Sequence, residues 1–263
     1  MIKESKEYSR RLVIVTGDKG GVGKSTFARG LVQAYLDTHQ DFVAFDADMS
    51  NPQIKRFYEN ECTVFPLDIF TRGEADLFLE DLKNLIEPVK NQDGEIQSSG
   101  KSLFLLELPP QSMKMFREFA CEMNFFEVAE QNLDLRVTMA TVISRTRDSV
   151  NQLLHLYDFC KGQVDYVIVK NLFFGKPDGF ERYNTSPSIK EIKEKGIGLP
   201  EISMADLIAH AYDYLDLNNF SFSKGILQDE RISVKGRVGA WMKNFKTSIN
   251  PVKDVLGLKD VTF

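Results

Sequence analysis

The chain alternates short apolar runs with segments in which apolar residues recur every three or four positions. The runs are rich in β-branched and aromatic residues and occupy residues 11–16, 42–45, 102–106, 135–143 and 165–169. Runs without polar alternation are typical of strands buried on both faces. Phe27, Leu31 and Tyr35 recur at helical spacing after the first run, and Val150 and Leu153 do so after the fourth. We expect an α/β fold with a mostly parallel sheet and right-handed helical crossovers.

The remaining segments divide the chain less sharply. Residues 50–83 mix helical and turn signals, and the polar stretch 84–101 predicts a loop or an exposed hairpin. We expect a polar tail at 1–10, one α/β domain at 11–217 and an appended C-terminal region at 218–263.

The composition indicates the cellular compartment in which the protein works. The 263 residues are 43% hydrophobic, none of their apolar runs approaches the length of a membrane span, and the N-terminus lacks the apolar stretch of a secretory signal. Three widely spaced cysteines form neither a disulfide framework nor a metal-binding pair. These features predict a cytoplasmic protein.

Charge is unevenly distributed. The net charge is −5, yet residues 231–253 carry six basic residues and no acidic one, which leaves −11 on the rest of the chain. Overall acidity argues against a protein that coats nucleic acid with its whole surface, but it does not exclude a local basic patch.

The most specific motif lies between the first predicted strand and the first predicted helix. Residues 17–26 read Gly-Asp-Lys-Gly-Gly-Val-Gly-Lys-Ser-Thr. Glycines let backbone N–H groups turn toward phosphate oxygens, and the following helix directs its positive end at the same anion. We expect Lys24 to reach the β- and γ-phosphates, Ser25 to hold Mg²⁺ and Thr26 to contact the α-phosphate. The loop as a whole, with Gly20, Gly21, Val22 and Gly23, is predicted to bind a nucleotide.

Two residues of the loop set it apart from the strict phosphate-loop pattern. Asp18 stands where that pattern has glycine, and Lys19 adds a second lysine. The string resembles the deviant Walker A motif of the MinD/ParA-type ATPases. The resemblance implies a P-loop NTPase fold, the cofactors ATP and Mg²⁺, and a homodimer in the ATP state. It also implies that Lys19 reaches the partner's phosphates across the dimer interface and contributes to hydrolysis; the alternative is a solvated loop lysine.

Acidic residues follow two of the predicted strands. By resemblance, Asp46 matches the family's catalytic aspartate, which orients the attacking water near Mg²⁺, and Glu107 stands at the Walker B position, where it holds a metal-bound water. The family usually has aspartate there. Asp48 is either a second carboxylate of the site or a turn residue.

Two further segments resemble the part of the family's site that binds the base. Asn171 corresponds to an asparagine that contacts the adenine edge, although asparagine at a strand end is also a common turn former. Residues 199–202 resemble the later loop that lines the base pocket.

The loop together with 46–53, 167–174 and 180–182 looks similar to the StbB-like plasmid stability and conjugation ATPases. The resemblance implies slow ATP hydrolysis by a dimerising switch that positions or partitions cargo, either plasmid DNA or a conjugation-related complex, with a stimulating partner protein. The alternatives are a nucleotide-bound scaffold that barely hydrolyses, a MinD-like membrane-associated ATPase, and a metabolic enzyme that activates a small acid.

Three interpretations of the basic C-terminal region remain open. Val238, Trp241, Met242 and Phe245 fall on one helical face, so a helix could pack on the domain through them. Alternatively, the region binds DNA without sequence preference or lies on a membrane, the last being disfavoured by two glycines and a following proline. The DNA-binding residues would be Arg231, Lys235, Arg237, Lys243 and Lys246.

Overall fold

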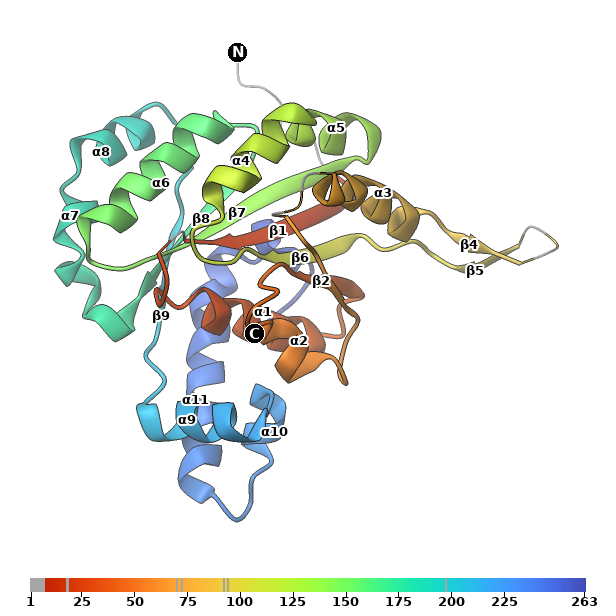
Figure 1. Cartoon of the computed structure of the whole chain (residues 1–263). Helices are drawn as coiled ribbons and strands as arrows, with labels where there is room; N and C mark the ends of the chain where they lie inside the picture. The colour runs from red at the N-terminus through yellow and green to blue at the C-terminus, as the bar shows by residue number, and fades with distance from the viewer. Residues whose placement is uncertain are drawn as a thin grey trace.

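The computed structural model describes residues 8–17, 19–69, 71, 73–91, 93, 95–196 and 198–263. Its centre is a seven-stranded parallel sheet in the order β3-β2-β6-β1-β7-β8-β9 (Figure 1). The strands are β1 Arg10–Thr16, β2 Phe42–Asp46, β3 Val64–Pro66, β6 Leu103–Glu107, β7 Leu135–Ile143, β8 Asp165–Asn171 and β9 Glu201–Met204. The predicted α/β class and all five predicted strands are confirmed, while β3 and β9 were not predicted.

Helices cover both faces of the sheet. The α-helices are α1 Lys24–Asp37, α2 Gln53–Tyr58, α3 Glu74–Ile86, α4 Met113–Glu122, α5 Phe125–Asn132, α6 Arg147–Cys160, α7 Glu181–Asn184, α8 Pro187–Glu194, α9 Ala209–Asn218, α10 Phe222–Ile226 and α11 Ile232–Ile249. The 3-10 turns are η1 Leu172–Phe174, η2 Pro177–Gly179, η3 Asn250–Val252 and η4 Asp254–Leu256.

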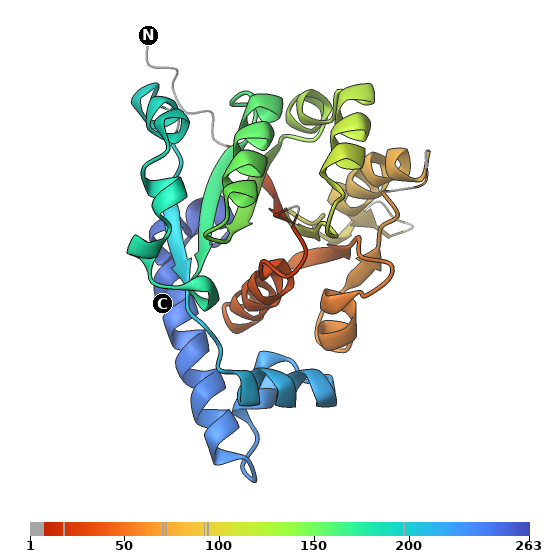
Figure 2. The same ribbon diagram turned by 60° about the vertical axis from the view of Figure 1, so that its left-hand side comes forward.

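The two faces have separate hydrophobic clusters. In β1, Leu12 and Ile14 point to the cluster shared with α3 to α8, whereas Val13 and Val15 point to the cluster shared with α1, α2, α9, α10 and α11. The three layers are visible from two directions (Figures 1 and 2). Burial on both faces explains why the strands lack polar alternation.

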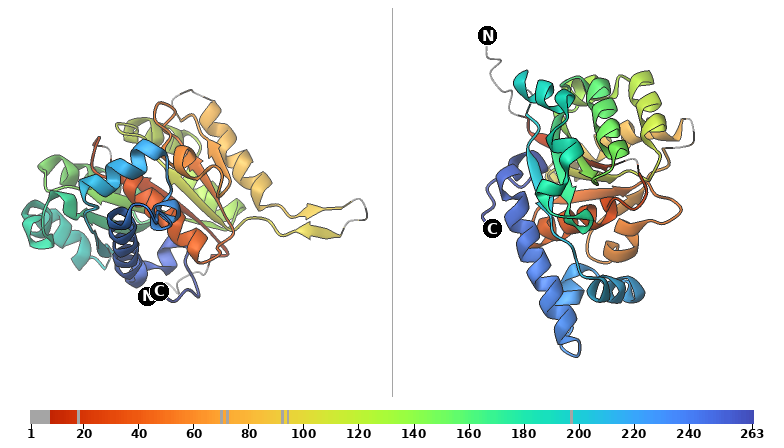
Figure 3. Two further views of the ribbon diagram at one scale, coloured as in Figure 1. Left: turned by 90° about the horizontal axis from the view of Figure 1, so that it is seen from below. Right: turned by 90° about the vertical axis from the view of Figure 1, so that its left-hand side faces the viewer.

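The segment 84–101 is partly a hairpin. Strands β4 (Val89–Lys90) and β5 (Ile96–Ser98) pair in antiparallel fashion and extend away from the sheet (Figure 3). This confirms the exposed hairpin, although α3 continues to Ile86 before it.

The C-terminal region packs on the sheet through the apolar face of α11. Val238, Trp241, Met242 and Phe245 are all buried there, which confirms the packing interpretation of this helix. The centroid of the Phe245 ring lies 5.5 Å from the centroid of the Phe27 ring in α1. The close approach requires Gly30, because a Cβ at that position would lie 2.8 Å from the Phe245 ring. These four side chains are therefore covered by protein, and are not a free face for a membrane.

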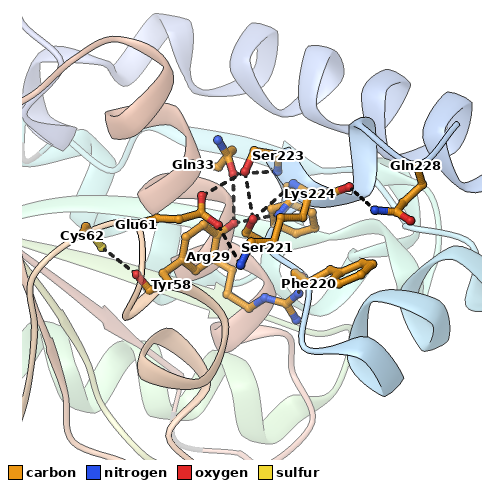
Figure 4. Close-up of polar contacts among 11 residues, drawn as sticks. Arg29, Gln33, Tyr58, Glu61, Cys62, Phe220, Ser221, Ser223, Lys224 and Gln228 are labelled. Atoms are coloured by element: carbon orange, nitrogen blue, oxygen red, sulfur yellow. Dashed lines mark hydrogen bonds and ion pairs between the residues drawn. The ribbon is translucent and has the colours of Figure 1, made fainter.

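Polar contacts also join the helices on this face of the sheet (Figure 4). The Gln33 side-chain oxygen accepts hydrogen bonds from the Tyr58 hydroxyl at 3.3 Å and from the Ser223 N–H at 2.9 Å. Arg29 is fully buried and its guanidinium lies 3.5 Å from the centre of the Phe57 ring. Helices α1 and α2 are thus bonded to the start of α10.

The basic charge of residues 231–253 is partly neutralised in three dimensions. Lys235 pairs with Asp229 at 2.6 Å and Lys246 pairs with Asp37 at 2.7 Å. Arg237 and Lys243 are exposed and form no ion pair with the described residues. No helix within the described residues combines the length and apolar character needed to cross a membrane.

The packing of α11 predicts a large stability effect. Phe245→Ala should lower the free energy of unfolding by about 3–5 kcal/mol, because it leaves a cavity between α11 and α1. Ile232→Ala, on the same helix but 77% exposed, should change it by less than about 0.5 kcal/mol. Urea unfolding of both variants measures the difference, and equal midpoints would contradict this packing.

Candidate functional site

The sheet order brings the ends of three strands together. Strand β1 lies between β6 and β7, and β2 lies on the far side of β6. Val15 pairs with Glu107 across β1 and β6, and Asp46 pairs with Glu107 across β2 and β6. Ligands of open α/β sheets bind outside the carboxyl ends of the strands, near such a change in strand order. The segments that carry the predicted site residues therefore converge at one edge.

The loop that follows β1 has the backbone of a phosphate cradle. Gly17, Gly21 and Gly23 have φ angles of 144°, 73° and 100°. A Cβ at Gly23 would lie 2.4 Å from the Asn171 side-chain nitrogen, so this position combines a left-handed backbone with a close neighbour. No side chain caps the first turn of α1. Its free N–H groups are a ready site for an anion. Asp18 lies outside the described residues.

Lys24 folds over this loop. The residue is 6% exposed, and its ammonium donates hydrogen bonds to the Gly17 carbonyl at 2.9 Å and to the Lys19 carbonyl at 3.4 Å. Lys19 itself is exposed, as is Gly20, whereas the side chain of Val22 is buried in the core.

Ser25 and Glu107 meet at the end of β6. The Ser25 hydroxyl donates a hydrogen bond of 2.5 Å to Oε1 of Glu107. The other carboxylate oxygen, Oε2, is buried and has no hydrogen-bond partner among the described residues. A hydroxyl beside a carboxylate with a spare oxygen is the kind of donor set that Mg²⁺ and its bound water prefer, so these residues fit the implied metal.

Asp46 lies on β2, directly beside Glu107 in the sheet. Its Oδ2 accepts hydrogen bonds from the N–H groups of Ile54 at 2.8 Å and Lys55 at 3.1 Å, and its Oδ1 accepts one from the Asp48 N–H at 3.2 Å. The carboxylate thereby holds the start of α2. Asp48 bonds the backbone of Ser50 and Asn51, the pattern expected of a turn residue.

Burial of the two neighbouring carboxylates alters their protonation. Desolvation, together with the charge of Asp46, raises the pKa of Glu107 from 4.5 to about 8, although the Ser25 hydrogen bond opposes the shift. Desolvation also raises the pKa of Asp46 to about 6 against the effect of its backbone hydrogen bonds. A cation near Glu107 would lower its pKa and favour the charged form.

These residues border a cavity of about 710 Å³. Among the predicted residues it is lined by Gly21, Gly23, Lys24, Ser25, Thr26, Glu107 and Asn171, with Asp48 in its wall. Asp46, Val22, Gly20 and Lys19 are not among its lining residues. The volume is of the size that binds nucleotides and other small ligands.

Asn171 braces the phosphate loop from β8. Its side-chain N–H donates to the Val22 carbonyl at 2.8 Å, and its side-chain oxygen accepts from the Phe173 N–H at 3.1 Å. It also lines the cavity. Both polar ends are engaged within the protein, a role that the spacing of the sequence did not indicate.

The loop expected to line the base pocket, residues 199–202, lies a few residues before the segment that lines the cavity. Residues 199–202 lead into and begin β9, and the cavity is lined instead by the segment after that strand, 204–209, together with Tyr212 and Asp213. The Trp241 indole N–H donates to the Ala205 carbonyl at 2.8 Å, so α11 supports this wall. The unrecognised strand β9 accounts for the shift.

The buried Glu107 carboxyl predicts a pH-dependent stability difference. Because the pKa of Glu107 is raised on folding, its contribution to stability is present near pH 5 and is lost as pH rises through about 8. Without nucleotide or metal, Glu107→Gln should therefore be more stable than the natural chain above pH 8, and the difference should shrink toward about pH 5. Urea unfolding of both proteins across this range measures it. A difference that does not vary with pH would contradict the shift.

Comparisons with known proteins agree with this geometry. Residues 13–193 match the model of the CobQ/CobB/MinD/ParA nucleotide-binding domain. Protein MobD of Acidithiobacillus ferrooxidans is 26% identical over 188 residues, which are 72% of this chain and 75% of MobD.

A solved structure with a nucleotide analogue shows the same fold. A Borrelia burgdorferi B31 protein assigned to plasmid partition, bound to AMPPNP, superposes with a TM-score of 0.52 at 14% identity, over 97% of this chain and all of that one. The MinD cell division protein of Aquifex aeolicus gives a TM-score of 0.47 at 13% identity, over 90% and 97% of the two chains. Since the family model spans more than half of its residues, the chain belongs to the CobQ/CobB/MinD/ParA family of nucleotide-binding domains.

Proposed function

We propose that this chain is a Mg²⁺-dependent ATPase that dimerises on ATP and uses slow hydrolysis to position or partition a cargo. The observation that carries the proposal is the convergence of Lys24, Ser25 and Glu107 on one cavity at the uncapped start of α1. The family binds nucleotides, and hydrolysis, dimerisation and cargo are our extension of that role.

The triphosphate would lie in the glycine turn. Lys24 donates to loop carbonyls in this structure. These bonds keep its ammonium beside the loop, from which it would turn to the β- and γ-phosphates. The free N–H groups of α1 and Thr26 would hold the remaining phosphate oxygens. Asn171 would limit the movement of the loop through its bond to Val22 and face the adenine edge from the cavity wall.

Ser25 would ligate Mg²⁺ directly and Glu107 would hold a metal-bound water. When bound, the ion neutralises charge that develops on the phosphates. We assign Asp46 the task of orienting the attacking water, also through the water shell of the metal. Three backbone N–H groups fix the direction of its carboxylate, and a carboxylate has acceptor capacity left beyond three bonds.

Lys19 would act on a second copy of the chain. It is exposed beside the loop rather than folded into the cavity, which is the placement that a residue acting across an interface needs. We propose a homodimer in the ATP state, a partner protein that stimulates turnover, and plasmid DNA or a conjugation-related complex as cargo. DNA contact through the C-terminal region would depend on Arg231, Arg237 and Lys243, because Lys235 and Lys246 already form ion pairs.

One observation favours a second candidate, a nucleotide-bound scaffold that barely hydrolyses. Asp46 is engaged by backbone N–H groups and does not line the cavity. Steady-state ATPase assays with and without DNA separate the two, since no turnover in either condition would favour the scaffold.

Removing the loop lysine should weaken ATP binding directly. Lys24→Ala loses a charge-assisted interaction with the phosphates, so affinity should fall by at least about tenfold. Titration with a fluorescent ATP analogue measures it, with Lys161→Ala on the distant α6–β8 turn as the control. Unchanged affinity in Lys24→Ala would remove the phosphate-loop assignment.

Removing the second lysine should separate binding from turnover. Lys19→Ala should bind ATP with nearly unchanged affinity but lose ATP-dependent dimerisation or most of its hydrolysis, because the charge is missing only at the partner's phosphates. Nucleotide titration and phosphate release measured on one preparation test both. Full ATPase activity in this variant would defeat the trans-acting role while leaving the nucleotide site intact.

A further inference from the structure

A second cavity lies at the same edge of the sheet as the nucleotide cavity. It has a volume of about 360 Å³ and is lined by Arg145, Thr146, Arg147, Phe174, Gly179 and Arg182. The turn η1 separates the two cavities, because Phe173 lines the first and Phe174 lines the second. Their rings form a T-shaped pair with centroids 5.2 Å apart. The second cavity is therefore distinct from the predicted nucleotide site but shares a wall with it.

Three arginines from three segments surround this cavity. Arg145 follows β7, Arg147 begins α6 and Arg182 lies in α7, and α6 and α7 contact each other. All three are exposed. Within the described residues, no carboxylate lies within ion-pair distance of any of the three guanidinium groups. The three arginines also donate no hydrogen bond to another described side chain. By contrast, Lys235 and Lys246 of the basic C-terminal region have acidic partners.

The turn after β8 accommodates one of these arginines closely. A Cβ at Gly175 would lie 3.4 Å from Cδ of Arg145, and one at Gly179 would lie 3.7 Å from the same atom. Arg145 thus passes beside two glycines of this turn and lines the same cavity as Arg147 and Arg182.

The chemistry of the lining selects the kind of ligand. A guanidinium presents a planar fork of N–H donors that stays charged at all accessible pH values. One carboxylate is satisfied by a single fork, whereas the oxygens of a phosphate point in several directions and accept from several forks together. Three unpaired guanidiniums around one small hollow therefore match a phosphate better than an isolated acidic side chain.

We propose that the cavity formed by Arg145, Arg147 and Arg182 is a phosphate-binding site separate from the nucleotide site. Its ligand is a phosphate group, carried either by a small phosphorylated anion or by the backbone of a nucleic acid. The proposal does not depend on ATP hydrolysis or dimerisation, since it rests on the second cavity alone.

The test uses the full chain loaded with AMPPNP and freed of excess nucleotide, so that the phosphate loop is filled. One arm titrates inorganic phosphate by calorimetry, and the other titrates a short labelled DNA duplex by fluorescence anisotropy. The cavity variant is Arg145→Gln/Arg182→Gln. The control, Lys83→Gln/Lys161→Gln, removes two charges from exposed positions on α3 and on the α6–β8 turn, away from both cavities and from the basic face of α11. Equal AMPPNP content and equal circular dichroism verify that both variants are folded.

The natural chain and the control should bind phosphate equally, and the cavity variant should bind at least about tenfold more weakly. A matching loss of duplex binding in the cavity variant alone would identify the nucleic-acid backbone as the source, and unchanged duplex binding would identify a small anion. The proposal is overturned if the natural chain binds neither probe, or if the cavity variant binds both as tightly as the natural chain does. Displacement of phosphate by polyglutamate at equal charge concentration would overturn it as well.

Discussion

The register of β1, β6 and β2 is the constraint on which the site depends. It places the glycine loop, Glu107 and Asp46 side by side at the carboxyl edge of the sheet. Two neighbouring carboxylates buried in this way are costly unless cations or hydrogen bonds compensate for them. The Ser25 hydroxyl and the N–H groups at the start of α2 supply part of that compensation. The pKa of Glu107 is still raised, so burial of its charge is not fully compensated, and a bound cation would supply the remaining stabilisation.

The same edge is supported from behind by the C-terminal helix. Through Phe245 and Gly30, α11 packs on α1, the helix that carries the phosphate loop. Through Trp241 it bonds the segment that forms the far wall of the cavity. The basic stretch that dominated the charge pattern therefore first supports the wall of the cavity that the glycine loop borders. Its charge is partly neutralised by Asp37 and Asp229.

The five longer strands and the glycine loop could be predicted because each is specified by a short continuous segment of sequence. Buried strands in a parallel sheet have recognisable apolar runs, and a phosphate loop needs its residues within one short segment. Strands β3 and β9 escaped prediction because they are only three and four residues long. The brace between Asn171 and Val22 joins residues far apart in the sequence, as does the arginine cavity. Spacing along the chain carries no information about such contacts, which depend on how β7, β8 and the turns after them pack.

We propose that the bound nucleotide controls whether two copies of the chain associate, through a site that each copy forms at one edge of its sheet. Sedimentation velocity of the natural chain with Mg²⁺ and either AMPPNP or ADP tests this most directly. We expect a dimer with AMPPNP and a monomer with ADP at the same protein concentration. A sedimentation coefficient that does not change between the two nucleotides would contradict it.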